Sequence, residues 1–397
     1  MPLLAASALG CGGNEDSSHA TGDADGPVYA LHTVVFDPEY NATSYVTLTD
    51  SVDLDSVPFD SAREFAGYAF VASFDGKLLV SDGESPVITR YDVASDLAWS
   101  PGERRSFEQH GVTGGGAGFE RHWFRDANTA YLTLNVTSRV VWDPTNFEIL
   151  GVYEDSAIPL ERDGLVLDAT FNRQPRIHDA PLLKPFYYRD EDWFEFAPLT
   201  LLATYDAETH AESSLLEVPC PALEVPSVDE VGNTYLSAWT FGPVLSLYGV
   251  GPELCVRRIK PDATLDEAWA PDLTAWTEGR PVKVFRYLRD GKALATVLHT
   301  EELSADFTGA YDPDVDTESE SHYRLWLFDL EQETAAPVEG IDEMNSGFHS
   351  ATLEGRTFVF APIEDWSATR VYEVDLDGTA ELRFETVGRL SEWIRVR

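Results

Sequence analysis

The sequence predicts an all-β protein that folds as a seven-bladed β-propeller with four-stranded blades. Helical periodicity is almost absent, and short runs rich in Val, Tyr, Phe, Thr and Leu alternate with Gly, Asp, Asn and Pro turns. One pattern of two strands joined by a loop returns six times along the chain. The two chain ends hold further strands that belong to none of these copies, and together they supply a seventh blade.

The repeated unit is a turn with a short strand, followed after a variable loop by a second strand that ends in an aromatic or apolar residue and then usually Asp. Its clearest copy begins at Asp75-Gly76-Lys77 and ends at Tyr91-Asp92. The copies lie at residues 75–92, 128–143, 184–206, 232–259, 290–329 and 354–375. Their spacing of about 45 to 65 residues is the size of a four-stranded blade.

The chain ends complement each other. Residues 28–55 hold two or three strands with no inner strand before them, and residues 390–397 alternate as one strand without a blade of its own. We expect the C-terminal strand to complete the N-terminal sheet, because ring closure pairs edge strands that would otherwise lie open to other chains. The competing architecture, an array of two-sheet sandwiches, would not need complementary ends.

The charge balance excludes one class of partner. The 397 residues include 69 acidic and 28 basic side chains, for a formal charge of −41. An excess this large repels phosphate backbones and anionic membrane surfaces, so we expect no nucleic-acid binding. The bias toward acids and away from Lys suits salty or extracellular surroundings, although a high-GC genome would produce the same composition.

The first 27 residues indicate export and lipid anchoring. Residues 1–10 are largely small and apolar, and the segment Ala8-Leu9-Gly10-Cys11 resembles a bacterial lipobox, in which the Cys is acylated. Two departures are that Ala8 stands where Leu is usual and that no basic residue precedes the apolar run. We predict a signal peptide over 1–10, lipidation of Cys11, a disordered tether over 11–27 and the propeller over 28–397.

This anchor sets the expected location. Gly12 rather than Asp after the Cys favours the outer membrane, with the protein facing the periplasm or the cell surface. No later segment approaches the roughly 20 apolar residues that span a bilayer, so contact with the membrane would be through the lipid alone. The alternative is a cytosolic protein with a frayed N-terminus.

The two remaining cysteines are Cys220 and Cys255. In an exported protein two such residues usually form a disulfide. A bridge would close a loop of about 35 residues and add roughly 3 kcal/mol of stability. The alternative is a pair of buried thiols.

Three segments resemble a known family. They are residues 82–91, with the sequence Asp-Gly-Glu-Ser-Pro-Val-Ile-Thr-Arg-Tyr, the turn at 141–145, and residues 227–235. They resemble the propeller lipoproteins encoded beside myxochelin-type siderophore genes in myxobacteria, and the resemblance covers most of the chain from about residue 65 onward. It implies a periplasmic or surface lipoprotein linked to iron uptake, and it implies no catalytic residues.

We expect the binding site at one end of the central channel, where the loops between second and third strands meet those between blades. Arg and His supply donors for anionic or catecholate oxygens, and Trp supplies flat faces for stacking. The candidate ligand-binding residues are Arg121, His122, Trp123, Arg139, Arg176, His178, Trp239, His299 and His349, with Trp193 and Trp366 in the same loops. The alternative is that each Arg or His caps a neighbouring blade by hydrogen bonds.

Motifs for catalysis and metal binding are missing. Asp312, Asp314 and Asp316 alternate as in a calcium loop, but Thr317 and Tyr323 replace the required Gly and Glu, so calcium is only a weak alternative to a solvated acidic loop. The sequence has no Gly-x-Ser-x-Gly, His-x-x-x-His or Cys-x-x-Cys pattern. The Gly-rich run at 114–118 lacks the Lys of a phosphate loop. We therefore predict no cofactor and no catalytic residue.

The sequence thus predicts a monomeric, lipid-anchored envelope protein that binds or scaffolds without catalysis, with a ferric siderophore or another envelope protein as partner. The alternative is a propeller enzyme, a lactonase-like hydrolase or a quinone-type dehydrogenase, with its site in the channel. That alternative stays open because propeller enzymes assemble their sites from dispersed residues. A third interpretation is protein docking on the broad faces of the disc.

Overall fold

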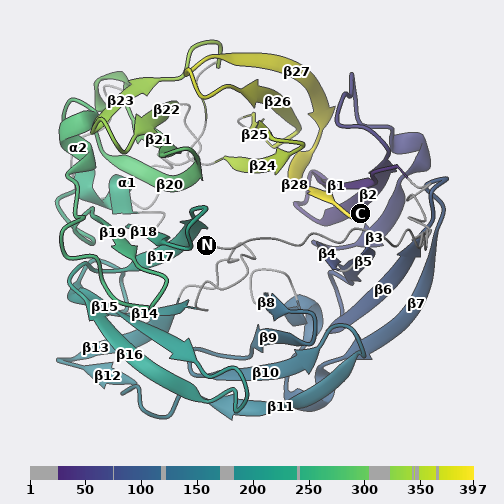
Figure 1. Ribbon diagram of the computed structural model, residues 1–397, viewed down its shortest axis with the longest axis horizontal. Helices are drawn as coiled ribbons and strands as arrows, with labels where there is room; N and C mark the ends of the chain where they lie inside the picture. The colour runs from purple at the N-terminus through teal and green to yellow at the C-terminus, as the bar shows by residue number, and fades with distance from the viewer. Residues whose placement is uncertain are drawn as a thin grey trace, which may run out of the picture.

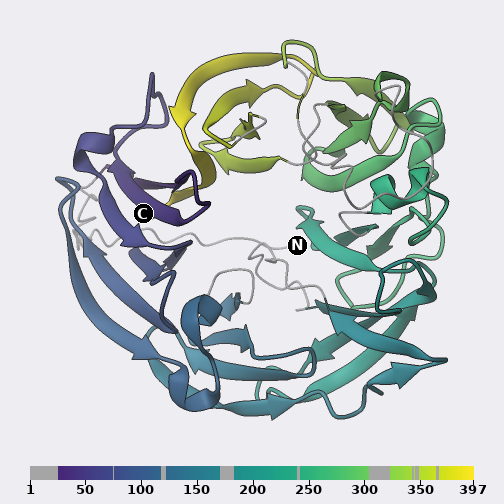
Figure 2. The same cartoon turned by 180° about the vertical axis from the view of Figure 1, so that it is seen from behind.

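A computed structural model describes residues 26–74, 76–117, 122–169, 183–238, 242–303, 322–341, 344, 348–363 and 366–397. Seven antiparallel sheets stand in a ring around a central opening (Figures 1 and 2). The prediction of a seven-bladed β-propeller is confirmed. No helix within the described ranges is long and apolar enough to cross a membrane.

The blades are numbered from the one that closes the ring. Blade 1 contains β28 (Arg389–Arg395), β1 (Tyr29–Phe36), β2 (Ala42–Thr49) and β3 (Arg63–Ala66). Blade 2 contains β4 (Phe70–Phe74), β5 (Lys77–Ser81), β6 (Val87–Val93) and β7 (Trp99–Ser106). Blade 3 contains β8 (His122–Asp126), β9 (Thr129–Thr133), β10 (Ser138–Asp143) and β11 (Glu148–Glu154).

Blades 4 and 5 depart from four strands. Blade 4 contains β12 (Glu161–Arg162), β13 (Leu165–Ala169), β14 (Leu183–Arg189), β15 (Phe196–Tyr205) and β16 (Glu212–Val218). Blade 5 contains β17 (Leu223–Val228), β18 (Thr234–Ala238) and β19 (Val256–Ile259), with helix α1 (Gly242–Leu247) between β18 and β19. Helix α2 (Leu273–Trp276) follows at the place in the chain where other blades have a fourth strand.

Blades 6 and 7 return to four strands. Blade 6 contains β20 (Val282–Arg289), β21 (Lys292–Leu298), β22 (Tyr323–Asp329) and β23 (Thr334–Pro337). Blade 7 contains β24 (His349–Leu353), β25 (Arg356–Pro362), β26 (Ala368–Val374) and β27 (Ala380–Val387). Short 3₁₀ turns lie at η1 (Phe59–Ser61), η2 (Glu108–His110), η3 (Gly114–Ala117) and η5 (Thr300–Glu302).

Burial explains the composition of the strands. The second strand of a blade is buried between its sheet neighbours and the adjacent blades, and all residues of β9 and β18 are buried. These strands consist of apolar residues, Thr and Ser, and they show no alternation of buried and exposed positions. The outer strand β11 faces solvent on one side and alternates exposed with half-buried residues. The repeated unit found in the sequence corresponds to the second and third strands of blades 2, 3, 5, 6 and 7, and to β14 and β15 of the five-stranded blade 4.

The ring closes as the sequence predicts. Strand β28 at the C-terminus pairs antiparallel with β1, with Trp393 opposite Leu31 and Arg395 opposite Tyr29. Figure 1 shows the yellow C-terminal strand beside the purple N-terminal one. Trp393 is 2% exposed, and its ring lies 4.7 Å from that of Phe358 in blade 7.

Third-strand hydroxyls tie successive blades together. Ser44 donates to Gly67 O at 2.9 Å, and Thr369 donates to Gly388 O at 2.8 Å. Each hydroxyl also accepts a backbone N–H, from Ala69 and Leu390 respectively. Thr200 makes the same pair of contacts between blades 4 and 5. The linkers into the next inner strand therefore have satisfied backbone groups where they enter the core.

The predicted disulfide is present. Cys220 and Cys255 are bridged with a Cα–Cα distance of 6.2 Å and a separation of 35 residues. Cys220 lies in the linker between blades 4 and 5, in a buried cluster with Leu223 and Leu236. Cys255 directly precedes β19. The bridge therefore joins the blade 4–5 core to blade 5, whose sheet has three strands.

Loss of the closing aromatic is expected to weaken the whole ring. Trp393→Ala should lower the free energy of unfolding by about 3 to 5 kcal/mol, because it leaves a cavity at the joint of blades 7 and 1. Urea denaturation followed by circular dichroism measures this change. Leu382→Ala is the control, since Leu382 is 50% exposed on β27 and its loss should cost less than about 0.5 kcal/mol. Equal losses for both variants would contradict the closure account.

Candidate functional site

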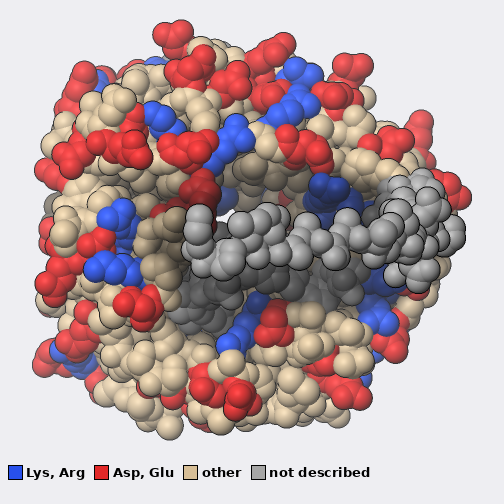
Figure 3. Space-filling model, viewed as in Figure 1, with Lys and Arg blue, Asp and Glu red and all other residues tan. Residues whose placement is uncertain are grey.

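The described residues of blades 6 and 7 define one face of the ring. His349 begins the inner strand β24 and pairs with Phe360 near the end of β25, and Val282 pairs in the same way with Val297. Because the blades are connected alike, inner strands begin and second strands end on one face, which we call the mouth. Figure 3 shows acidic side chains spread over one face of the disc and several Lys and Arg side chains at the rim of the central hollow.

Several predicted residues lie outside the described part of the chain. They are Cys11, Arg121, Arg176, His178, Trp239, Asp312, Asp314 and Asp316. Their predicted roles in lipidation, ligand binding and calcium binding stay predictions. Among the residues that the structure does describe, no group of three or more His, Cys, Asp or Glu could hold a metal ion.

His122 and Trp123 lie in the core between blades. Both are 1% exposed at the start of β8. The His122 ring stacks on Phe70 of blade 2 at 5.6 Å with an interplanar angle of 12°, and it meets the edges of Phe107 and Trp142. These contacts fit the alternative in which such residues join neighbouring blades.

Arg139 is buried between blades 3 and 4. Its guanidinium forms an ion pair with Asp155, donates to His210 O at 2.6 Å and lies 3.9 Å above the Tyr205 ring. Asp155 also receives a 3.3 Å hydrogen bond from Lys184, and all three charged side chains are fully buried. Sequence analysis did not foresee this cluster, because its members are separated by up to 45 residues.

Burial destabilises the charged form of the Lys184 amine. Its ammonium donates to Val136 O at 2.6 Å and to Asp155, and it lies 4.6 Å from the centre of the Phe186 ring. Burial lowers the pKa of Lys184 to about 8, and the attraction of Asp155 limits that fall. The cluster joins blades 3 and 4, and its three charged side chains have no surface that a ligand could contact.

His349 and Trp366 meet at the mouth together with Arg389. Arg389 Nη2 and His349 Nε2 are 2.6 Å apart, and they come from the first residues of β28 and β24. A guanidinium can only donate, so His349 Nε2 accepts and the imidazole is neutral. Trp366 is 36% exposed, and the Arg389 guanidinium lies 4.1 Å above its ring. Arg389 was missed because it begins a strand whose partner is at the other end of the chain.

His299 carries the features of a general base. It follows β21 at the mouth, and its Nδ1 lies 3.2 Å from Glu301 Oε1. Trp326 Nε1 donates to His299 Nε2 at 3.4 Å. An indole N–H is only a donor, so His299 Nε2 accepts and the ring proton resides on Nδ1, whose nitrogen lies 3.2 Å from Glu301 Oε1. Burial lowers the pKa of His299 below 6.5, which keeps the ring neutral at neutral pH.

An ion pair with Arg280 holds Glu301 in place. Arg280 Nη2 and Nε donate to Glu301 Oε1 at 2.8 and 3.1 Å. These hydrogen bonds lower the pKa of Glu301 to about 2, so it is ionised throughout the neutral range. Arg280 thus fixes an ionised carboxylate 3.2 Å from His299 Nδ1, where its charge favours the protonated form of the ring. Sequence analysis selected His299 but missed Glu301, two residues on, and Arg280, in the linker before β20.

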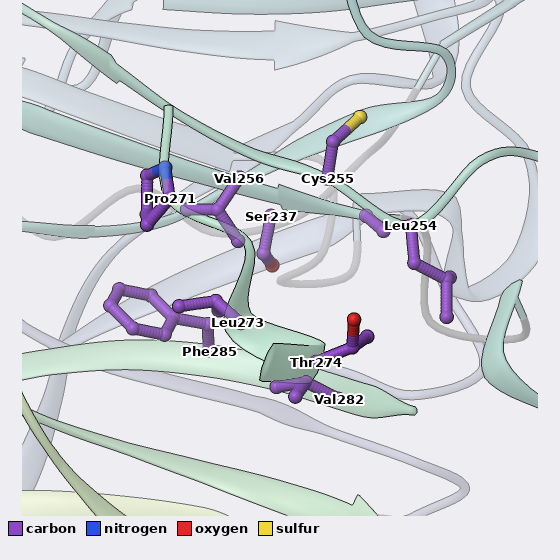
Figure 4. Close-up of a pocket in the computed structure, with 10 residues that line it drawn as sticks. Ser237, Leu254, Cys255, Val256, Pro271, Leu273, Thr274, Val282 and Phe285 are labelled. Carbon is purple, nitrogen blue, oxygen red and sulfur yellow. The ribbon is translucent and has the colours of Figure 1, made fainter. Parts of the chain in front are cut away.

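A separate pocket lies between blades 5 and 6 (Figure 4). It encloses about 340 Å³ of space, part of it open to solvent. Its lining comes from β18, the start of β19, α2 and β20, and is mainly apolar: Ser237, Ala238, Leu254, Cys255, Val256, Pro271, Leu273, Thr274, Val282 and Phe285. Cys255 is held in the disulfide, and the pocket has no acid or base for catalysis.

Comparison with known proteins shows the fold. No protein-family model matches the chain, and no curated protein matches its sequence. The solved structure of the Pseudomonas aeruginosa periplasmic gluconolactonase PpgL is similar, with a TM-score of 0.55 and 13% identity over 93% of this chain and 99% of that one. A candidate 6-phosphogluconolactonase from Bacteroides fragilis has a TM-score of 0.54 and 10% identity over 94% of this chain and 99% of that one.

These neighbours contradict the prediction that the protein is not an enzyme. Structures that match almost the whole chain are named as lactonases, and the alternative of a lactonase-like propeller enzyme is better supported than the binding role. The sequence favoured a non-enzyme because it has no contiguous catalytic motif, a signal that a propeller enzyme built from dispersed residues does not give. Identities of 10 and 13% show the fold alone. Nothing found bears on the myxobacterial lipoprotein family, on a siderophore or on the outer membrane, and those remain predictions.

The buried lysine should produce a measurable pH dependence of stability. Between its folded pKa of about 8 and its ordinary value of 10.5, the unfolded chain binds more protons than the folded chain. The free energy of unfolding therefore rises with pH across this range, by up to about 3 kcal/mol relative to Lys184→Met. Urea denaturation of both proteins at pH 7.5 and pH 10 measures the difference. A difference that is the same at the two pH values would refute the assignment.

Proposed function

We propose that this protein is a hydrolase that opens a cyclic ester, with His299 as its general base at the mouth of the channel. The arrangement of Arg280, Glu301 and His299 is the observation that carries the proposal, because it places a neutral imidazole beside a carboxylate that can stabilise its protonated form. The likeness of the whole fold to structures named as gluconolactonases supports the choice of ester. Residues dispersed over a propeller suffice for such chemistry.

The reaction needs one base and one water molecule. The long hydrogen bond from Trp326 to His299 Nε2 must open first, because Nε2 has a single lone pair. His299 Nε2 then takes a proton from the water as the water oxygen attacks the lactone carbonyl carbon, and the charge of Glu301, 3.2 Å from Nδ1, stabilises the new imidazolium. The tetrahedral intermediate collapses with cleavage of the ring C–O bond. The proton passes from His299 to the leaving alkoxide, so the product is an open-chain hydroxy acid and the imidazole is regenerated.

The surroundings of His299 fit this role. Its side chain is 9% exposed, so it lies near the surface of the ring interior and not deep in a blade interface as His122 does. The 3.4 Å hydrogen bond from Trp326 to Nε2 is long, as contacts of catalytic groups often are before substrate binds.

Removing the base should abolish most of the activity. We expect the full chain to hydrolyse glucono-δ-lactone above the spontaneous rate, and His299→Gln to lower kcat by roughly 100-fold or more. Titration of the acid released, with a heat-inactivated sample as blank, measures this. His110→Gln is the matched control, because His110 lies in η2 with Gln109 as its neighbour. Hydrolysis no faster than the blank across a panel of five- and six-membered lactones would eliminate the proposal.

The pH profile should report His299. Because burial lowers its pKa, kcat/KM is expected to rise through an inflection below pH 6.5 and to stay level above it. Glu301→Gln removes the carboxylate that favours the protonated ring, so the inflection should move to still lower pH while kcat falls. Rates measured between pH 5 and 7.5 avoid fast spontaneous opening. If the inflection lies at the same pH in Glu301→Gln as in the unchanged protein, Glu301 does not act on the base.

A further inference from the structure

Helix α1 packs directly against the strand ends that carry His299. Val244 of α1, Leu298 and Tyr323 form one buried cluster, with Leu247 and Tyr248 at its edge. Leu298 precedes His299 in the chain and pairs in register with Tyr323. A shift of α1 would therefore move the backbone at Leu298, and with it the neighbouring His299.

The chain from α1 to Cys255 is short and tightly held. Val250 N donates to Leu245 O at 3.2 Å, and Gly251 N donates to Phe194 O of blade 4 at 2.9 Å. A Cβ atom on Gly251 would come within 2.6 Å of Leu245 Cβ, so the turn lies close against the helix. A shift of Cys255 would therefore also displace α1, because only a few closely packed residues separate them.

The other half of the disulfide is fixed in the core. Cys220 is buried, its N–H donates to Val218 O at 2.8 Å, and its carbonyl accepts the Thr200 hydroxyl at 2.7 Å. In contrast, Cys255 is half-buried and lines the pocket between blades 5 and 6 (Figure 4). A small dithiol can therefore approach the bridge from the Cys255 side.

The disulfide compensates for the missing fourth strand of blade 5. Strand β19 has four residues and pairs along its length only with β18, while Ile259 makes a single bridge to Leu265. Other blades hold their third strand between two neighbours. The disulfide supplies the second attachment that a fourth strand provides elsewhere.

We propose that the Cys220–Cys255 disulfide is a redox-sensitive brace that positions the mouth around His299, and that its reduction lowers the activity of the site. The part that concerns activity rests on the proposed hydrolase function. A reductant thiolate attacks the Cys255 sulfur, the S–S bond breaks, and Cys220 leaves as a thiolate that takes up a proton. The second thiol of the reductant then releases Cys255 as a thiol, and the reductant leaves oxidised by two electrons.

The test compares the full-length oxidised protein with the same protein after dithiothreitol. Intact mass with thiol alkylation reports the state of the bridge. Hydrogen exchange is expected to become at least about tenfold faster at residues 242–250 and 298–303 after reduction, and to change little in β9, which is buried in blade 3. Glucono-δ-lactone turnover is expected to fall roughly tenfold, because small displacements of a catalytic group are costly.

A double variant, Cys220→Ala with Cys255→Ala, is the matched control. It should show the exchange pattern of the reduced protein and no response to dithiothreitol. A bridge that resists reduction in the folded protein, or unchanged exchange at 242–250 and 298–303, would overturn the brace. Faster exchange with unchanged turnover would overturn its effect on activity. Faster exchange in a protein with no lactone turnover in either state would uphold the brace and reject the hydrolase function instead.

Discussion

The structure depends on one contact between the two ends of the chain, the antiparallel pairing of β28 with β1. This pairing gives blade 1 its inner strand and turns a row of sheets into a ring. Polar contacts strengthen the same joint: Tyr29 donates to Glu354 at 2.7 Å, and Arg356 pairs with Asp53 at 2.7 Å. Closure also has a functional consequence, because it brings Arg389 of β28 next to His349 of β24.

Neighbouring blade interfaces are filled by different kinds of side chain. Between blades 2 and 3 an aromatic cluster of Phe70, Phe107, His122 and Trp142 fills the space. Between blades 3 and 4 Arg139, Asp155 and Lys184 are buried instead. A buried ionic cluster is stable only when its members satisfy one another, and replacement by apolar residues can be neutral or stabilising. The charged interface therefore specifies which faces meet more than it adds stability.

The candidate site shows why motif searches fail in propellers. Glu301 lies two residues from His299, but Arg280 comes from the linker before β20, and Trp326 comes from β22. No fixed spacing in the sequence connects these four side chains. They meet because the strands of blade 6 pair in register and return to the mouth. The disulfide in blade 5 acts on the same region through α1, which packs on Leu298 and Tyr323.

The sequence by itself determined the fold and its closure, because strand periodicity, turn residues and a repeat of blade length are local signals that survive without a structure. It also favoured a Cys220–Cys255 bridge over two buried thiols, because the third cysteine, Cys11, is expected to carry the lipid. Only the tertiary structure decided which polar residues face the channel and which join blades. His122 and His299 look alike in sequence, yet the first stacks on Phe70 and meets Trp142 edge-on, whereas the second lies 3.2 Å from Glu301. The physical reason is that burial, pKa and hydrogen-bond partners are set by residues far away in the chain.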